Sequence, residues 1–572
     1  MYILGIHVGQ HDSAASLFKD KKLVAFCKEE RLTREKNCGK NFDLLAIDEV
    51  CRIASITREE LDVVALSRVY LPASCYLKRE RFFVEKVREL KGRRVQRRLY
   101  SAMNKYHQYD ETKLVDFKAL KKYLRVRDDT EIKFINHHYS HIIPAFKYTN
   151  WEKDALFISC DGGGDYAYYS AYYYDGNKLE CLLGDDIETL KHHQNEGASV
   201  GLAYCSTTQH LGFMPNRHEG KVTGLAAFGK PVAGDTIRGW YQIKDDYRVD
   251  SDVLKRRKDI DDKIKKLCSE LTREDMASSI QYATEQVVLD WVKKIIADRP
   301  VKYIGMSGGV FSNVLLNQKV SELPGIEDTF IVPPMGDEGL PLGNCVAVLI
   351  EKYGLNNIDR GLLRTAYYGY KYKPEQLITE AKERRYRVEL PEDLPAKVAE
   401  LLEKHQVGAI FAERMEMGPR ALGARTILAN PTERGINDSL NDRLGRTEFM
   451  PFAPYVLDVD ADEVFEMVPA KILPSRYMTI TTFVKKKYHD LIQAVVHIDG
   501  TARPQIVYRD DNPLYYDILK AFKERTKIPC LVNTSFNAHE EPIINTPGEA
   551  LNALRDKRVD FLVCNEGLVF LP

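Results

Sequence analysis

The chain has 572 residues, of which 44% are hydrophobic and 29% charged, values typical of a folded globular protein. Lys plus Arg and Asp plus Glu are equal at 83 each, so no overall charge favours nucleic acid or an anionic membrane surface. This length exceeds what one hydrophobic core usually serves, and we expect two large domains.

The first half of the chain predicts alternating strands and helices. Segments 2–9 and 13–30 predict three strands, with a hairpin turn at Lys19–Lys22. Two further strands are expected around the glycine-rich stretch "DGGGD" at 161–165, and 273–299 has the apolar spacing of an amphipathic helix. A strand, a small-residue loop and a helix follow at 302–320.

The second half continues the alternation after a connector at about 352–373. Residues 374–385 and 394–406 predict helices, and strands are expected at 407–413, 493–498 and 528–535. No internal repeat is visible in the sequence. The pattern indicates an α/β protein with domains at 1–355 and 356–572.

The cysteines and the apolar segments indicate the cellular compartment of the protein. The eleven cysteines are scattered without a CxxC pair, which argues against a zinc ribbon or disulfide scaffold and favours a reducing cytoplasm. The N-terminus lacks the basic region of a signal peptide, and no uncharged apolar run approaches the length that spans a membrane. We therefore expect a cytoplasmic protein without a membrane partner.

A histidine pair and two aspartates are candidate metal ligands. His137 and His141 are four residues apart in "NHHYSH", so a helix beginning there would place both imidazoles on one side. Asp161 and Asp337 each lie beside glycines after an expected strand, and two histidines with aspartates suit iron, manganese or zinc. The alternative is that these are ordinary helix-start histidines and turn aspartates.

Several loops of the first half could bind an anion. The loop Ser307–Asn313 leads into a helix N-terminus, but its spacing matches neither a Rossmann nor a P-loop motif. His11 and Asp12 follow the first strand, and Lys36 follows the third. The basic segment 78–98 indicates either a solvated helical face or a patch for nucleic acid or another anion.

The second half carries arginines in segments that otherwise look buried. Buried arginines need anionic partners, so their grouping with polar loop residues favours a phosphate or acyl-phosphate pocket. The alternative is a set of structural Arg–carboxylate bridges. The residues concerned are Arg414, Arg420, Arg425, Arg443, Arg446, His497, Arg503, Asn533, Thr534, Ser535 and Asn537.

With these motifs in order, the chain resembles the NodU/CmcH family of ATP-dependent O-carbamoyltransferases, which includes the tobramycin carbamoyltransferase. The resemblance spans nearly the whole chain, through "HDSAASL", "EERLTREK", "HHYSH", "DGGGD", "GKVTGLAAFGKP", "SGGVFSN", "MGDEGLPLG", "RMEMGPRALGARTILANP", "PFAP", "HIDGTARPQ" and "NTSFNAHEEPI". It implies an N-terminal domain of the actin/Hsp70/sugar-kinase (ASKHA) fold, similar to TsaD/Kae proteins, and a YrdC-like C-terminal domain.

The resemblance also implies two active sites. In the second domain, carbamoyl phosphate and ATP would give carbamoyl-adenylate; in the first, an acceptor hydroxyl would attack that intermediate. It implies metal ligation by His137, His141, Asp337 and Asp161, with Fe²⁺ expected there and Mg²⁺ accompanying ATP. The other implied residues are His11 with Asp12 as base, His138 as second candidate base, Lys36, Gly162, Gly163, Ser307, Gly308, Gly309 and Asn313 at the nucleotide, and Arg420, Arg446, Arg503 and Ser535 at carbamoyl phosphate.

One departure from the family pattern concerns the donor. Before "PFAP" the family usually has a lysine and an arginine where this chain has Leu444 and Met450, so two cations of the phosphate pocket are missing. Either Arg443 or another group compensates, or the donor differs, or adenylate formation is slow.

Three functions remain open from the sequence. The first is carbamoyl transfer to a small hydroxylated sugar or specialised metabolite, as in antibiotic biosynthesis. The second is a tRNA-modifying threonylcarbamoyl-transferase-like enzyme, and the third is a non-enzymatic ATP-binding regulator. The acceptor and the oligomeric state, with a homodimer as one option, are not given by the sequence.

Overall fold

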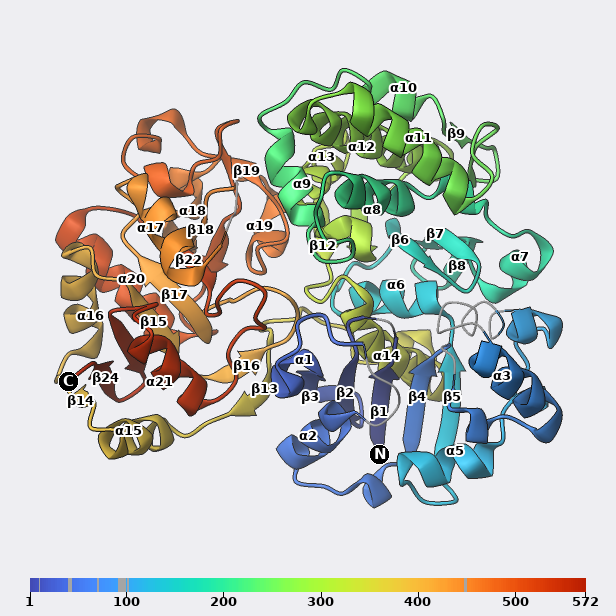
Figure 1. The fold of residues 1–572 in the computed structure, drawn as a ribbon, viewed down its shortest axis with the longest axis horizontal. Helices are drawn as coiled ribbons and strands as arrows, with labels where there is room; N and C mark the ends of the chain where they lie inside the picture. Colours follow the sequence, from blue (N-terminus) through green and yellow to red (C-terminus); the bar gives the residue numbers. More distant parts are fainter. Residues whose placement is uncertain (10, 40–43, 69–70, 91–98, 100–101, 447–449) are drawn as a thin grey trace.

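The computed structural model describes residues 1–9, 11–39, 44–68, 71–90, 99, 102–446 and 450–572. Helices and strands alternate, which confirms the predicted α/β class. Figure 1 shows three groups of elements: an N-terminal sheet with its helices, a second group in green and cyan above it, and the C-terminal region in orange and red beside both. Within the described residues, no helix combines the length and apolarity that crossing a bilayer requires.

The first sheet has the strand order β3-β2-β1-β4-β5. Strands β1 to β3 form an antiparallel meander, as predicted, whereas β4 and β5 continue in parallel from β1. Its elements are β1 Tyr2–His7, β2 Ala14–Lys19, β3 Lys22–Lys28, α1 Glu30–Thr33, α2 Leu45–Ala54, β4 Val63–Ser67, α3 Lys78–Leu90, α5 Phe117–Leu124, β5 Glu131–Ile135 and α6 His137–Lys147.

The second sheet repeats this topology. Its order is β12-β11-β6-β7-β8, in which an antiparallel meander β6 to β8 is extended in parallel by β11 and β12. Its elements are β6 Ala155–Gly164, β7 Ala167–Tyr174, β8 Leu179–Leu183, α8 Val200–His210, α9 Glu219–Ala226, α11 Arg257–Glu270, α12 Arg273–Asp298, β11 Tyr303–Ser307, α13 Val314–Ser321, β12 Asp328–Ile331 and α14 Leu340–Tyr353. The duplication fits the ASKHA fold implied by the resemblance, although no repeat is visible in the sequence.

The last helix of each unit packs on the sheet of the other unit. Helix α6 contacts β6 and β11, whereas α14 contacts β1, β2 and β4. The two helices also pack on each other so closely that a Cβ added at Gly343 would lie 1.8 Å from the Ser140 carbonyl oxygen. This crossing places the starts of α6 and α14 beside the ends of β1 and β6.

The C-terminal region is built on an eight-stranded mixed sheet of order β14-β24-β23-β15-β17-β22-β18-β21. One large hydrophobic core joins its strands to the helices that cover it. Its main elements are β14 Arg387–Glu389, β15 Gly408–Phe411, β17 Arg425–Ala429, β18 Ala453–Leu457, β21 Gln505–Val507, β22 Cys530–Ser535, β23 Phe561–Cys564, β24 Gly567–Phe570, α15 Pro374–Glu383, α16 Leu394–Glu403, α17 Gly435–Leu444, α20 Pro513–Thr526 and α21 Pro547–Arg555.

Three local predictions were wrong. Residues 493–498 form a short 3₁₀ turn and irregular chain rather than a strand, because Ala494 and Val495 pack in the core without sheet pairing. The connector contains a strand, β13 Tyr367–Lys371, paired with β16 Arg414–Glu416. The glycines after Asp161 belong to β6, which bulges there, and the turn falls at Asp165–Tyr166, both with positive φ.

Candidate functional site

Four side chains of metal-ligating type converge where the two repeated units meet. His137 and His141 lie one turn apart at the start of α6, whose first turn is capped by Asn136 through the Tyr139 N–H at 2.9 Å. Asp161 lies near the end of β6, and Asp337 begins the short 3₁₀ turn that leads into α14. One ligand atom from each of the four lies within 4.8 Å of the others.

The spacing of these atoms suits one bound cation. From His137 Nε2, the distance is 2.9 Å to Asp161 Oδ2, 3.2 Å to His141 Nε2 and 3.7 Å to Asp337 Oδ1. From His141 Nε2, it is 3.4 Å to Asp161 Oδ2 and 3.5 Å to Asp337 Oδ1. Ligands about 2.1 Å from a tetrahedral metal would be roughly 3.4 Å apart, so the donor set fits an iron-, manganese- or zinc-type ion.

Electrostatics within the cluster favour charged carboxylates. Burial acts against ionisation of Asp161, but His137 and His141 outweigh it and hold the pKa of Asp161 well below its usual range. Burial lowers the pKa of His141, yet Asp161 and Asp337 outweigh that effect and raise it to about 9. Without a cation, the protonated His141 therefore offsets part of the negative charge of the two aspartates.

The end of β1 faces the same cluster. The buried imidazole of His7, which the sequence did not single out, lies with Nε2 3.6 Å from Asp337 Oδ2. Burial lowers the pKa of His7 to about 4, so its ring is neutral. His7 lies at the end of the first strand, a position equivalent to that of Asp161 in the second unit. This position was the sequence signal that could have identified His7 as a site residue.

His11 and Asp12 form a pair beside His7. Asp12 Oδ2 lies 3.0 Å from His11 Nδ1, and Asp12 Oδ1 lies 3.5 Å from the Nζ of the buried Lys28. Burial would lower the pKa of His11, but Asp12, Asp337 and Asp161 raise it to about 9. Lys28 also contacts Glu30 at 3.3 Å, so this pair is anchored to a buried ionic network that the sequence did not predict.

His138, the second candidate base, is not brought into the cluster. It is fully buried, with Nδ1 2.6 Å from Ser159 Oγ and Nε2 2.9 Å from the Ala167 carbonyl oxygen. Burial lowers its pKa to about 3. Both ring nitrogens are therefore engaged in linking α6 to β6 and β7.

The predicted glycines have different local roles. Gly162 faces open space, whereas Gly163 has a φ of +126° and Gly164 has no room for a Cβ, which would lie 2.2 Å from the His137 ring. The third glycine is thus required by the approach of His137 rather than by a ligand. Gly162 is the member of the group that leaves room for one.

The loop after β11 lies next to Asp161. A Cβ added at Gly309 would lie 3.0 Å from Asp161 Oδ1, and Gly308 has a φ of +96° beside Cys160. Ser307 is buried at the end of β11. Asn313 caps α13 through the Leu316 N–H and exchanges hydrogen bonds with Gln281, so its amide is engaged in the fold.

In the C-terminal region, Arg446 is held beside β22. Its Nη1 donates to Thr534 Oγ1 at 2.8 Å, and its Nη2 lies 3.1 Å from Ser535 Oγ and 2.8 Å from the Asn537 carbonyl oxygen. The structure thus brings the predicted Arg446 and Ser535 together. The oxygens of Thr534, Ser535 and Asn537 fix the position of this guanidinium, which is a group suited to binding an anion.

Arg420 and Arg503 lie on loops near the same sheet. The loop of Arg420 contacts β22 through the Ala421 carbonyl oxygen, which accepts from Asn533 Nδ2 at 3.1 Å. Arg503 lies between β20 Thr501–Ala502 and β21. Burial is the largest effect on the pKa of His497, and the positive charge of Arg503 lowers it further, to about 4.

Arginines after β3 connect the two halves of the chain. Arg31 Nη2 donates to the Gly418 carbonyl oxygen at 3.0 Å, and Arg34 donates to the carbonyl oxygens of Ile543 and Pro542 at 2.9 and 2.8 Å. Lys36 lies near them; burial lowers its pKa, and Glu540, Glu30, Arg446 and Arg217 also act on it. Charged residues of both halves, Arg446 among them, therefore influence Lys36.

The two departures from the family pattern are accommodated by packing. Leu444 lies in the C-terminal hydrophobic core with 2% of its surface exposed. Met450 packs against α9, where a Cβ added at Gly224 would lie 2.8 Å from Met450 Cγ. Arg443 is paired with Asp560 at 2.8 Å, an interaction that holds it away from a compensating role at the Arg446 site.

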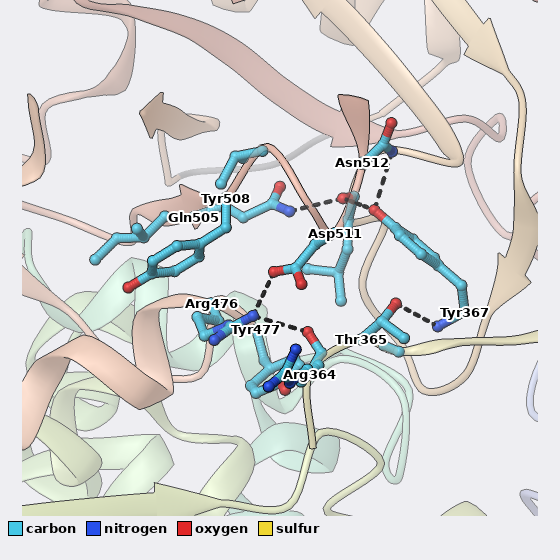
Figure 2. A pocket seen from close by; sticks show the side chains of 13 residues that line it. Arg364, Thr365, Tyr367, Arg476, Tyr477, Gln505, Tyr508, Asp511 and Asn512 are labelled. Atoms are coloured by element: carbon cyan, nitrogen blue, oxygen red, sulfur yellow. Dashed lines mark hydrogen bonds and ion pairs between the residues drawn. The ribbon is translucent and has the colours of Figure 1, made fainter. Parts of the chain in front are cut away.

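A separate pocket lies where the connector meets the C-terminal sheet (Figure 2). Arg476 donates to the Arg364 carbonyl oxygen and pairs with Asp511, and Asn512 Nδ2 donates to the Tyr367 hydroxyl at 3.1 Å. Its cavity of about 20 Å³ has room for one water molecule. This pocket is too small for a substrate.

Of the basic segment 78–98, residues 91–98 lie outside the described part of the chain.

Comparisons with known proteins identify the family of this chain. Residues 2–346 match the family model described as "Carbamoyltransferase N-terminus", and residues 399–570 match "Carbamoyltransferase C-terminus". The chain belongs to the carbamoyltransferase family. The resemblance inferred from the motifs is thereby confirmed.

Relatives of this carbamoyltransferase align over most of their length. An uncharacterized protein of Methanocaldococcus jannaschii is 30% identical over 99% of both chains. Nodulation protein NolNO of Sinorhizobium fredii is 29% identical over 98% of this chain and 79% of its own. Nodulation protein NolO of Bradyrhizobium diazoefficiens is 30% identical over 76% of this chain and 78% of its own.

Solved structures are more distant. Component A of the (R)-2-hydroxyglutaryl-CoA dehydratase of Acidaminococcus fermentans is 14% identical, covers 61% of this carbamoyltransferase and 98% of its own chain, and has a TM-score of 0.35. Full-length HypF in a phosphate- and nucleotide-bound form is 15% identical over 62% of this chain and 56% of its own, with a TM-score of 0.31. The fold assignment therefore rests on the duplicated sheet topology.

Proposed function

We propose that the C-terminal region of this carbamoyltransferase hydrolyses carbamoyl phosphate to carbamate and phosphate, and that the carbamate displaces pyrophosphate from ATP to give carbamoyl-adenylate. In the N-terminal region, a hydroxyl of a small acceptor would then take the carbamoyl group and release AMP. The observation that carries the proposal is the convergence of His137, His141, Asp161 and Asp337 beside the His11–Asp12 pair. The domain boundary near residue 355 and the YrdC-like nature of the second domain are part of this proposal.

The N-terminal cluster would hold a divalent cation, which we propose is Fe²⁺. The four residues His137, His141, Asp161 and Asp337 fit such an ion in donor type and spacing. When bound, the cation supplies Lewis-acid polarisation and charge neutralisation for the transferred group. Gly162, which has open space beside it, and the neighbouring loop Ser307–Gly309 would contact the nucleotide in this site. Mg²⁺ would accompany ATP in the adenylate-forming site.

His11 would take the proton of the acceptor hydroxyl. Its pKa of about 9 in the ligand-free protein is raised in part by Asp337 and Asp161. Neutralising these two carboxylates lowers the pKa of His11 towards the range of a general base. Asp12, held by Lys28, would orient the imidazole and stabilise its charged form.

Arginines would offset the repulsion between two polyanionic substrates. Arg446 is fixed by Thr534, Ser535 and Asn537, so its charge is placed before the substrates arrive. Arg420 and Arg503 lie on neighbouring loops and would complete the pocket. Carbamoyl-adenylate hydrolyses readily in water, so we expect it to pass along the seam where Arg31, Arg34 and Lys36 meet the C-terminal loops.

Two assays test the proposal under anaerobic ferrous conditions. Pyrophosphate release should require both ATP and carbamoyl phosphate, should be abolished by Arg503→Ala and should survive His137→Ala. A mass-spectrometric screen of candidate acceptors, with tRNA included, should find an adduct of about 43 Da that His137→Ala no longer forms. Release that ignores carbamoyl phosphate would refute the donor assignment.

A further inference from the structure

A second group of metal-ligating side chains lies on the seam between the two halves of the chain. It consists of His218, which precedes α9 in the second repeated unit, and His539 and Glu540 in the loop after β22. One ligand atom from each of the three lies within 4.8 Å of the others. None of these residues belongs to the sites described above, and His218 is 322 residues from Glu540 in sequence.

Both imidazoles approach the same carboxylate oxygen. His218 Nε2 lies 2.7 Å from Glu540 Oε1, and His539 Nε2 lies 3.6 Å from that atom. The rings are stacked with centroids 6.1 Å apart and an interplanar angle of 27°. Two imidazole nitrogens and one carboxylate oxygen at these separations form a set that zinc and similar ions bind, with a position left for water.

Glu540 is oriented so that its Oε1 atom faces the two imidazoles. Its other oxygen, Oε2, pairs with Arg217 Nη2 at 2.8 Å, and such an outer partner orients a ligating carboxylate. Its backbone has a φ of +60°, a left-handed conformation that favours glycine. The glutamate side chain therefore occupies a position that the backbone alone would assign to glycine.

The three side chains are accessible to an ion from solvent. Their exposed fractions are 15% for His218, 29% for His539 and 33% for Glu540. His218 Nδ1 accepts from the Met214 N–H at 3.2 Å, so Nε2 carries the proton that faces Glu540. An ion bound at Nε2 must displace this proton and weaken the Met214 contact, and both costs lower the affinity of the site.

We propose that His218, His539 and Glu540 bind a zinc-class divalent ion that joins α9 to the loop after β22 and so clamps the two halves of the enzyme together. The ion would lie beside Lys36, on which Glu540 and Arg446 act electrostatically. Occupancy would therefore hold the seam between the two proposed active sites. This inference does not depend on the proposed reaction.

Metal binding is measured on the full chain with the buried cluster silenced by His137→Ala and Asp337→Asn. Titration with Zn²⁺ should show one remaining site, and Co²⁺ at that site should give the visible absorption of a low-symmetry cobalt centre. Adding His539→Asn should weaken this binding by at least about 10-fold. Adding His405→Asn, a change at an exposed histidine far along the chain, should leave it unchanged.

Glu540→Gly is a second variant that should not destabilise the fold, because glycine adopts the left-handed backbone conformation at this position without strain. It should fold normally and lose the second site. Zn²⁺ should also slow hydrogen exchange at 214–220 and 537–541 in the parent protein. Unchanged Zn²⁺ stoichiometry in both His539→Asn and Glu540→Gly would overturn the proposed site, and binding without slower exchange would overturn the clamp.

Discussion

The cluster at the start of α6 gathers carboxylates and imidazoles, whereas the site beside β22 gathers a guanidinium, hydroxyls and carbonyl oxygens. In the first, the ligand-free protein offsets part of the negative charge itself, because His141 carries a proton between Asp161 and Asp337. In the second, hydroxyl and carbonyl oxygens fix the position of the Arg446 guanidinium. The first arrangement suits a cation that replaces a proton, and the second suits an anion.

The comparison also shows how each site is supported. The cation cluster depends on the crossing of α6 and α14, two helices of different units that approach at Gly343 and Ser140. The anion site depends mainly on one sheet and the loops after its strands. A substitution at one of the two sites should therefore leave ligand binding at the other site unchanged.

The largest effect is expected from Asp161→Asn, which removes a charged ligand that contacts both His137 and His141. The affinity for Fe²⁺ or Zn²⁺ at the buried cluster should fall by at least about 100-fold, because the variant loses one of two charged ligands and leaves Asp337 as the remaining carboxylate of the four residues. Equilibrium dialysis with elemental analysis measures this loss. Asp252→Asn, at an exposed carboxylate, is the control and should bind metal as the parent does.

Arg446→Met should affect the other site alone. Removing a charged donor that meets an anion costs about 1.5–3 kcal/mol, so KM for carbamoyl phosphate should rise roughly 10- to 100-fold while metal binding is unchanged. The matched control is Arg443→Met, because Arg443 is paired with Asp560. Equal losses in the two variants would show that the pocket does not centre on Arg446.

The smallest effect concerns acid stability of the C-terminal region. Burial, with the charge of Arg503, lowers the pKa of His497 from 6.5 to about 4 in the folded protein, so the unfolded chain binds the extra proton as pH falls below 6.5. This group therefore stabilises the fold above pH 6.5 and loses about 2 kcal/mol of that contribution by pH 5. His497→Gln should flatten the pH dependence of urea unfolding over this range; an unchanged slope would contradict the assignment.

Local chemistry made much of the fold predictable from sequence. The three-stranded start, helix 273–298 and the strand–loop–helix around Ser307 follow from apolar periodicity and turn residues, which act between near neighbours. The segment 493–498 failed because its apolar run is consistent with a strand, and only packing showed that no partner strand pairs with it. The duplicated topology left no visible repeat in the sequence, because two units can share strand order without sharing side chains.

The sequence by itself placed His137 and His141 on one helix face. It also marked Asp161 and Asp337 as candidate metal ligands and Arg446 as a candidate residue of an anion pocket. Only the tertiary structure decided that His7 faces Asp337, that His138 is buried away from the cluster, and that His218 meets Glu540 across the seam. The reason is physical. Spacing along a helix or strand determines which side chains share a face, but the meeting of distant segments depends on how whole sheets and helices pack.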